Sequence, residues 1–494
     1  SPTLLTTTAK AATPKKGGRF RAGVPAFSTT DTLDPATHTD IGNYFIEWQV
    51  RNNLIELDHD GKAIPELAES MEASANAVTW VFKLRKGVEF HNGKTLEAED
   101  VIYSLNHHRG KDSKSGGKAM VEQIKSIKAD GKNTVIFELT GGNADFPYIL
   151  SDYHFAIFPS GTKGKEFDKG IGTGGYVLES FEPGIRAFVK RNPNYWKEGR
   201  AHFDEVETLG IADVNSRTNA LKTGQIDWMP RVEVKTAHLL KKTKGIKVIQ
   251  ANGTFHYDMP MFMDVSPYNN NDVRLALKYA IDREQILEKV LLGYGYVGND
   301  HPIGRIQKFY ASELPQRTYD PDKAKYHLKK AGMQGHTFQL HTSSHAGFVD
   351  HAMLYKEQAK NAGINIELVN HPTDGYWSNV WLKKPFCSSH WHGRITSDFM
   401  FSIAYSGDAP WNESHFRHDR FEKLLVEARA EIDETKRRDM YYEMQKIVRD
   451  EGSAIIYVFR DFVEAVTEKI QFDQFSGTNE GDGARAPERW WFKA

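Results

Sequence analysis

The chain has 494 residues, 39% of them hydrophobic and 26% charged, which is an ordinary composition for a folded protein but too long for one hydrophobic core. Its 64 basic and 65 acidic residues nearly cancel, so the sequence carries no basic footprint for nucleic acid. No run approaches the roughly 18 apolar residues of a membrane span. These properties argue against a nucleic-acid-binding or membrane-spanning protein and predict two or three domains.

The N-terminal residues 1–18, SPTLLTTTAKAATPKKGG, are small, polar and typical of a linker. They lack the charged and then apolar pattern of a signal peptide, so we expect a mature N-terminus from which a signal peptide has been removed. They also begin without the cysteine of a lipid-anchored mature form. The one cysteine, Cys387, excludes an intrachain disulfide and neither requires nor excludes an oxidising compartment.

The first predicted elements are a strand at 19–24 and a segment with helical apolar spacing at 41–57. The block TWVFKLRKGVEFHNGKTLEAEDV follows at 79–101. Its first six residues alternate as a strand with one buried face, and His91 to Lys94 predict a turn. Thr95 is then positioned to N-cap a helix whose first turn is acidic.

Strands and helices continue to alternate, which predicts an α/β chain. Asp282, at the end of the helical segment 271–286, is expected as an N-cap, and Asp320 caps a further helix that begins at Pro321. Two amphipathic helices are predicted within 413–450. Besides the block at 79–101, the most distinctive segments are GTGGY (172–176), KRNPNYW (190–196), ALKTGQID (220–227), NDVRLALKYAIDREQI (271–286) and YDPDKAKYHLKKAG (319–332).

In this order, the block and these five segments resemble the family 5 extracellular solute-binding proteins, the large receptors of bacterial ABC importers for peptides, nickel chelates, opines and some sugars. The resemblance implies a two-lobed α/β fold of the type II, cluster C-like periplasmic class. It implies a first lobe at 19–265 with an inserted subdomain at about 60–165, a second lobe at 266–455, and a return of 456–494 to the first lobe.

The same resemblance implies a periplasmic, monomeric receptor without catalysis, cofactor or metal, which closes over a small solute and delivers it to an inner-membrane ABC permease. A polar solute buried between two lobes must have its charged and hydrogen-bonding groups matched. The few charged and aromatic residues of the cleft are therefore expected to define the ligand class.

Arg394 is the candidate that decides the predicted ligand class. Peptide-binding relatives resemble Trp-x-Gly-Asp here, with the Asp on the ligand's ammonium, whereas this chain has Trp391-His392-Gly393-Arg394. A guanidinium in place of a carboxylate favours a carboxylate or phosphate. We therefore expect an anionic or sugar-like solute, such as an opine or a sugar phosphodiester. The alternatives are a dipeptide or oligopeptide ligand and a structural salt bridge between Arg394 and Asp398.

Other candidate ligand-binding residues lie in both predicted lobes. The second lobe supplies aromatic side chains suited to sugar rings or aliphatic chains, and the first supplies a glycine-rich turn whose backbone donors could hold an anion. The alternatives are core packing and turn formation. The candidates are Trp377, Trp391, Trp411, His345 and Asp398 in the second lobe, and Gly142, Asn143, Tyr153 and His154 in the first.

Two competing functions remain open from the sequence. Cys387-Ser-Ser-His390-Trp-His392 spaces soft ligands plausibly for a transition metal, which would fit a nickel- or metal-chelate receptor. A secreted hydrolase is the alternative of another class. Against it, the chain has no Gly-x-Ser-x-Gly elbow, phosphate-binding glycine loop or His-Glu-x-x-His motif.

Overall fold

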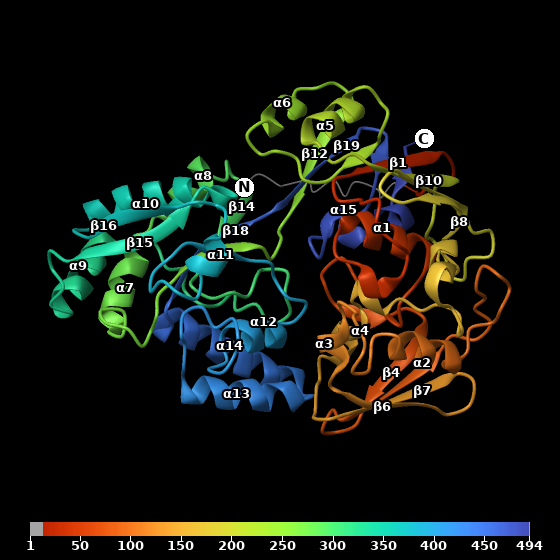
Figure 1. Ribbon diagram of the computed structural model, residues 1–494, viewed down its shortest axis with the longest axis horizontal. Helices are drawn as coiled ribbons and strands as arrows, with labels where there is room; N and C mark the ends of the chain where they lie inside the picture. Colours follow the sequence, from red (N-terminus) through yellow and green to blue (C-terminus); the bar gives the residue numbers. More distant parts are fainter. Residues whose placement is uncertain (1–12, 494) are drawn as a thin grey trace, which may run out of the picture.

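The computed structural model describes residues 13–493, and two lobes stand side by side in it (Figure 1). Of the predicted N-terminal tail, 1–12 lie outside the described residues. At its end, the Gly17 amide donates to the His202 carbonyl oxygen at 2.8 Å, which attaches the chain to the first lobe just before its first strand. No helix within the described residues is long and apolar enough to cross a membrane.

A seven-stranded mixed sheet forms the centre of the first lobe. Its first strand, β1, lies parallel to β10 and β11, and the remaining pairs are antiparallel. Phe20 and Ala22 of β1 are fully buried, as the predicted strand requires. In spatial order the strands are β12 (Ile246–Ala251), β19 (Phe462–Thr467), β11 (Trp228–Met229), β1 (Arg19–Val24), β10 (Glu205–Gly210), β9 (Arg186–Arg191) and β8 (Tyr176–Glu182).

Helices and two short antiparallel strand pairs complete the first lobe. The helical spacing predicted at 41–57 holds only to Val50, because Arg51 ends the helix and the chain continues into a strand. The elements are α1 (Ile41–Val50), α5 (Val214–Lys222), α6 (Ala237–Lys241), α15 (Glu480–Ala484), α16 (Ala486–Arg489), β2 (Ile55–Leu57) with β3 (Ala63–Pro65), and β20 (Ile470–Gln471) with β21 (Trp491–Phe492).

An antiparallel four-stranded sheet between residues 68 and 150, called the inserted subdomain below, holds the block at 79–101. In spatial order its strands are β4 (Ala68–Ala73), β5 (Thr79–Leu84), β7 (Thr134–Leu139) and β6 (Ile124–Ala129), with helices α2 (Ala98–Asn106), α3 (Lys118–Val121) and α4 (Phe146–Leu150). The strand predicted in the block is β5, with Trp80, Phe82 and Leu84 buried.

The predicted N-cap of the following helix, Thr95, is wrong. Thr95 pairs with Glu89 in an isolated bridge and is therefore held in extended chain. Glu97 caps α2 instead: the Asp100 carboxylate accepts from the Glu97 amide at 2.9 Å, which completes a capping box. The helix thus begins three residues after Thr95.

The second lobe is built on the sheet β14–β18–β13–β17 and on the parallel pair β15–β16, with helices around them. Its strands are β13 (His256–Pro260), β14 (Gly295–Val297), β15 (Thr337–Ser343), β16 (Asn365–His371), β17 (Ser389–Trp391) and β18 (Ala454–Arg460). Its helices are α7 (Asn271–Tyr279), α8 (Arg283–Lys289), α9 (Pro321–Lys330), α10 (Phe348–Asn361), α11 (Tyr376–Asn379), α12 (Ser397–Ala404), α13 (Asp419–Ala430) and α14 (Glu434–Glu451).

Helix capping in the second lobe follows the sequence closely. Asp282 caps α8 by accepting from the Gln285 amide at 3.0 Å, and Asp320 caps α9 by accepting from the Lys323 amide at 2.9 Å. The two helices predicted within 413–450 are α13 and α14, which pack antiparallel at the bottom of the lobe in Figure 1. These capping predictions are confirmed because each depends on residues within one turn of chain.

Two neighbouring connections join the lobes. The chain passes from β12 to β13 at 252–255 and from β18 to β19 at 461, whereas the predicted boundaries were 265 and 455. The Arg460 amide donates to the Phe255 carbonyl oxygen at 2.8 Å, and Gln250 and Asn252 both donate to the Asp461 carboxylate. The two connections are therefore tied to each other.

Candidate functional site

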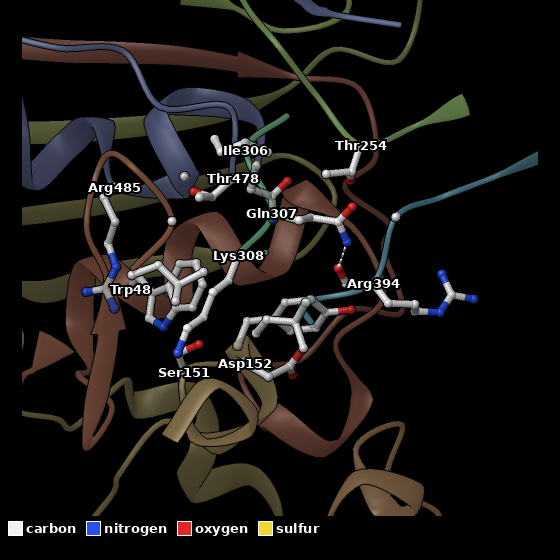
Figure 2. Close-up of a pocket in the computed structure, with 17 residues that line it drawn as sticks. Trp48, Ser151, Asp152, Thr254, Ile306, Gln307, Lys308, Arg394, Thr478 and Arg485 are labelled. Carbon is white, nitrogen blue, oxygen red and sulfur yellow. Dashed lines mark hydrogen bonds between the residues drawn. The ribbon is translucent and has the colours of Figure 1, made fainter. Parts of the chain in front are cut away.

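A cavity of about 220 Å³ lies between the lobes, next to these connections (Figure 2). Three separate segments of the first lobe and three of the second line it. From the first lobe come Trp48, Leu57, Gly61, Ser151, Asp152, Tyr153, Thr478, Asn479, Gly483 and Arg485. From the second come Thr254, Ile306, Gln307, Lys308, Gly393, Arg394 and Ile395. We call it the inner chamber.

Hydrogen bonds and close packing fix the second-lobe wall of the inner chamber. The Gln307 side-chain amide donates to the Arg394 carbonyl oxygen at 2.7 Å and accepts from the Gly304 amide at 2.6 Å, which locks two loops together. A Cβ on Gly393 would approach Thr254 Oγ1 to 2.0 Å, so only glycine fits beside the crossing strand. The position of Arg394 is therefore set by the backbone on either side of it.

Arg394 carries its charge without a carboxylate partner among residues 13–493. Its Nη1 donates to the His392 carbonyl oxygen at 2.7 Å, and the guanidinium lies 5.8 Å from the Trp391 ring centre. Burial lowers the pKa of Arg394 from its ordinary value, and no neighbouring charge offsets that effect. In Figure 2 the guanidinium points away from the other labelled residues of the chamber. The other guanidinium N–H groups have no hydrogen-bond partner among the described residues.

The other cations of the inner chamber are already paired. Arg485 is buried and donates to both Glu66 oxygens at 2.8 and 2.9 Å, while its guanidinium lies 4.4 Å from the Trp48 ring centre. Lys308 pairs at 2.9 Å with Glu434 of α14, in the same lobe. Among the lining residues, Arg394 is therefore the cation with donors to spare.

The chamber has one acidic lining residue, Asp152. Its carboxylate accepts from the Nδ1 of His154 at 2.6 Å and from the His154 amide at 3.0 Å. His154 lies buried behind it, with Nε2 against the His38 carbonyl oxygen at 3.0 Å. Tyr153 stacks on Tyr44 with ring centres 4.5 Å apart. Of the candidates predicted from sequence, Arg394 and Tyr153 line this chamber.

The aromatic candidates gather behind the rim around a buried carboxylate. Glu413 accepts from the Trp391 indole at 2.7 Å, from the Ser389 hydroxyl at 2.8 Å and also from the Trp381 indole. Trp391 is buried, whereas Trp411, packed 6.1 Å from its ring, is 41% exposed. Neither ring is part of the wall of the inner chamber.

The remaining candidates are also placed elsewhere. The proposed salt bridge between Arg394 and Asp398 is wrong: Asp398 pairs with Arg429 at 2.9 Å, because α12 and α13 bring these two side chains together. Asn143 is buried and donates to Gln123 at 2.7 Å, and a Cβ on Gly142 would meet the Asn76 carbonyl oxygen at 2.2 Å. These two residues shape a turn between β7 and α4.

The histidine-rich segment forms pairs. His341 Nδ1 lies 2.8 Å from His371 Nε2, and His345 Nε2 lies 3.4 Å from His390 Nε2, with Trp377 beside His345 at a ring-centre distance of 5.4 Å. Within residues 13–493 no three metal-ligating side chains come together. Cys387 is buried, and burial raises the pKa of its thiol well above the ordinary value. The thiolate is the form of cysteine that binds metals and acts as a nucleophile, and a raised pKa disfavours that form. Cys387 is therefore a poor candidate for either role.

The chain belongs to the bacterial extracellular solute-binding proteins, family 5. The sequence model of the family's middle region matches residues 62–413. The dipeptide-binding protein of Escherichia coli K12 is 26% identical over 490 residues, which cover 90% of this chain and 89% of that protein. The glutathione-binding protein GsiB of Shigella dysenteriae serotype 1 is 28% identical over 469 residues, 90% of each chain.

Solved structures agree on the two-lobed fold. The unliganded open form of MppA, a periplasmic murein tripeptide-binding protein, matches with a TM-score of 0.87 at 18% identity, covering 98% of this chain and 99% of that one. AgaA from A. tumefacien R10, in complex with agropinic acid, matches with a TM-score of 0.72 at 23% identity, covering 97% and 99%. The predicted family and fold class are confirmed.

Several lining residues escaped the sequence analysis. Trp48, Gln307, Lys308, Asn479 and Arg485 come from segments that matched no family pattern we recognised. Trp48 was predicted only as part of an apolar helical face. In the structure the Trp48 indole donates to Asn53 at 2.9 Å. A polar indole N–H on an otherwise apolar helix face was the available signal in the sequence.

Proposed function

We propose that this protein is the periplasmic receptor of an ABC importer, and that it binds a short peptide or peptide-like solute with a net negative charge. The receptor acts as a monomer, closes its lobes over the solute and delivers it to a permease in the inner membrane, without catalysis. The proposed negative charge of the solute rests on Arg394. This residue is a cation at the inner chamber with no carboxylate partner among the described residues.

Charge complementarity is the physical argument. A half-buried guanidinium is stabilised by a carboxylate that accepts two parallel hydrogen bonds from it, and it repels an ammonium group. Where peptide receptors resemble Trp-x-Gly-Asp, the Asp would attract that ammonium, so Arg394 reverses the preference at one end of the ligand. The solute then presents a carboxylate at the rim.

The peptide class is supported by the relatives and by the chamber's neutral polar groups. The sequence relatives are a dipeptide-binding and a glutathione-binding protein, so a peptide-like solute is better supported than the sugar phosphodiester expected from sequence. Ser151, Gln307, Thr478 and Asn479 add hydroxyl and amide groups to the walls, which suit the N–H and C=O groups of a peptide. An opine remains the second candidate because Arg394 favours its carboxylates equally.

The first experiment identifies the solute that copurifies with the protein. Mass spectrometry of material released by denaturation should find an acidic peptide or amino-acid derivative. Calorimetric titration with S-methylglutathione, which carries two carboxylates, should then show binding that Arg394→Gln weakens by about 10- to 100-fold, as expected for loss of a charge-assisted hydrogen bond worth roughly 1.5–3 kcal/mol.

The matched control is Arg420→Gln, which removes the same charge from an exposed ion pair with Glu443 on the second lobe. It should leave the affinity unchanged. Recovery of a basic or neutral peptide, or unchanged affinity for the acidic solute in Arg394→Gln, contradicts the proposed charge preference.

A further inference from the structure

A second and larger cavity, of about 820 Å³, adjoins the inner chamber. Both cavities are lined by Gly61 of the first lobe and by the loop Ile306–Lys308 of the second, so one strip of chain separates them. The larger one lies between the inserted subdomain and the turn that joins α13 to α14. We call it the outer chamber.

The deep walls of the outer chamber are apolar, and its charged lining residues are exposed except for the half-buried Lys308. Trp80, Pro147 and Tyr148 of the inserted subdomain are buried, and Met71 is half-buried beside them. From the opposite wall, Ile432 has 43% of its surface exposed. Lys62, Arg305 and Glu434 are largely exposed, which places their charges at the mouth. The interior therefore favours an apolar group over a charged one.

A buried ion pair holds the two walls together. The Asp145 carboxylate accepts from both terminal nitrogens of Arg437 at 2.8 Å, and the Ala144 amide donates to the Arg429 carbonyl oxygen at 2.7 Å. Asp145 belongs to the inserted subdomain, Arg437 to α14, and both are buried. The lobes thus meet at a place remote in sequence from the 252–255 and 461 connections, and Ala144 beside this contact lines the outer chamber.

This contact gives the outer chamber a fixed wall. Arg437 is fully buried, and its bidentate pair with Asp145 holds the subdomain against α14 in this conformation. A Cβ on Gly142 would meet Ala430 Cβ at 2.8 Å, so the two surfaces are also closely packed. The outer chamber therefore has a wall of packed protein where the subdomain meets α13 and α14. It is a bounded cavity and not only the open entrance to the cleft.

Size is the remaining argument. Ligand sites typically enclose roughly 300–1,000 Å³, and the inner chamber at about 220 Å³ falls below that range. The inner chamber alone holds a group with polar contacts on several sides, whereas a complete solute needs more room. The apolar space that continues past Lys308 supplies it.

We infer that the solute is amphiphilic and occupies both chambers: its anionic, peptide-like head lies in the inner chamber and an apolar or aromatic tail lies in the outer chamber. This inference rests on the proposed function for the head and adds the tail. Lys308 lines both chambers, and its ammonium lies 5.3 Å from the Tyr148 ring centre. The junction between the head and the tail of the solute is therefore expected next to Lys308. Hydrophobic peptides with a free or added carboxylate and acylated acidic amino acids belong to this class.

The test varies the tail at constant head. S-methyl-, S-butyl- and S-hexylglutathione share one head and differ only in alkyl length. Each methylene that leaves water should raise the affinity about fourfold, until the chamber is full. Dansyl-glutamate is an independent probe, because its aromatic tail fluoresces more strongly and at shorter wavelength when it enters an apolar site.

Ala73→Trp places a large ring in the outer chamber, from a half-buried position of β4. It should abolish the dependence on tail length and the dansyl signal while leaving S-methylglutathione unaffected. Ala129→Trp, at an exposed position of the same sheet, is the matched control and should behave as the unmodified protein. Ile432→Asn, at an exposed position, should weaken the longer conjugates only, and it keeps the test valid if Ala73→Trp fails to fold.

The outcomes separate the tail from the head. Equal affinity along the alkyl series, or no binding of any tailed probe, overturns the outer-chamber site. If S-methylglutathione still binds in that case, and Arg394→Gln weakens its binding, the proposed function stands without the outer-chamber site. If the tailed probes bind as well to Arg394→Gln as to the unmodified protein, the outer chamber stands and the head assignment falls.

Discussion

Two arginines line the inner chamber, and their surroundings differ. Arg485 is buried among Glu56, Glu66 and Glu488, with its nearest carboxylate oxygen at 2.8 Å. Arg394 lies at the rim with only a backbone carbonyl as a polar partner among the described residues. The same side chain is therefore fully paired within the fold in one place and lacks a carboxylate partner in the other, which is the basis for proposing Arg394 as the ligand-binding one.

The cluster around Arg485 is balanced within itself. Lys197 pairs with Glu56 and Glu488 at 2.8 Å each, and Arg200 lies 3.7 Å from Glu488. Burial alone would raise the pKa of Glu56, but Lys197 and Arg485 lower it to about 2. These groups stay charged because each has an opposite charge nearby.

The largest expected effect comes from removing Arg485. Arg485→Met keeps the volume but leaves Glu66 and Glu488 undercompensated in the interior, so the free energy of unfolding should fall by about 3–5 kcal/mol. Chemical denaturation measures it. Arg420→Met, which breaks an exposed pair, should leave the free energy of unfolding nearly unchanged. Equal losses in the two variants would remove the distinction between the two arginines.

The next effect concerns specificity. Arg394→Asp restores the Trp-x-Gly-Asp pattern and should exchange the preference, so that S-methylglutathione binds roughly 10- to 100-fold more weakly and a dipeptide with a free ammonium group gains affinity. Calorimetry with S-methylglutathione and alanyl-alanine checks both directions. A variant that loses the acidic ligand and gains nothing would show that Arg394 acts alone, without a peptide-shaped site behind it.

The last prediction concerns a buried histidine. His38 has neither ring nitrogen hydrogen-bonded, and burial, followed by Arg51, lowers its pKa to about 3. The unfolded chain takes up this proton below about pH 6.5 and the folded one does not, so stability should fall as the pH drops from about 6.5 toward 3. One such group contributes at most about 1.4 kcal/mol per pH unit.

Acid denaturation of His38→Gln measures this contribution. Its unfolding free energy should depend less steeply on pH over that window than that of the unmodified protein. His238→Gln, at an exposed site on α6, should leave the slope unchanged. An identical slope in all three proteins would mean that His38 is protonated in the folded state and paired with Glu47, whose carboxylate lies 3.8 Å away.

The sequence by itself determined the local elements and, through them, the family. The strand at Thr79–Leu84, the caps at Asp282 and Asp320, and helices α13 and α14 depend on alternation and capping within one turn of chain. Such signals are local, and six of them in order were enough to identify a two-lobed receptor. Thr95 was misplaced because a bridge to Glu89 extended the chain before the helix began.

Only the tertiary structure decided which residues line the inner chamber. Asp398 is four residues from Arg394 but pairs with Arg429, and Trp391 turns its indole to Glu413, because the folded neighbours supply better partners. The inner chamber joins α1, the loop at 306–308 and the segment at 478–485, which are far apart in the chain. No local pattern records that convergence, since the side chains come together only after the sheets and lobes have packed.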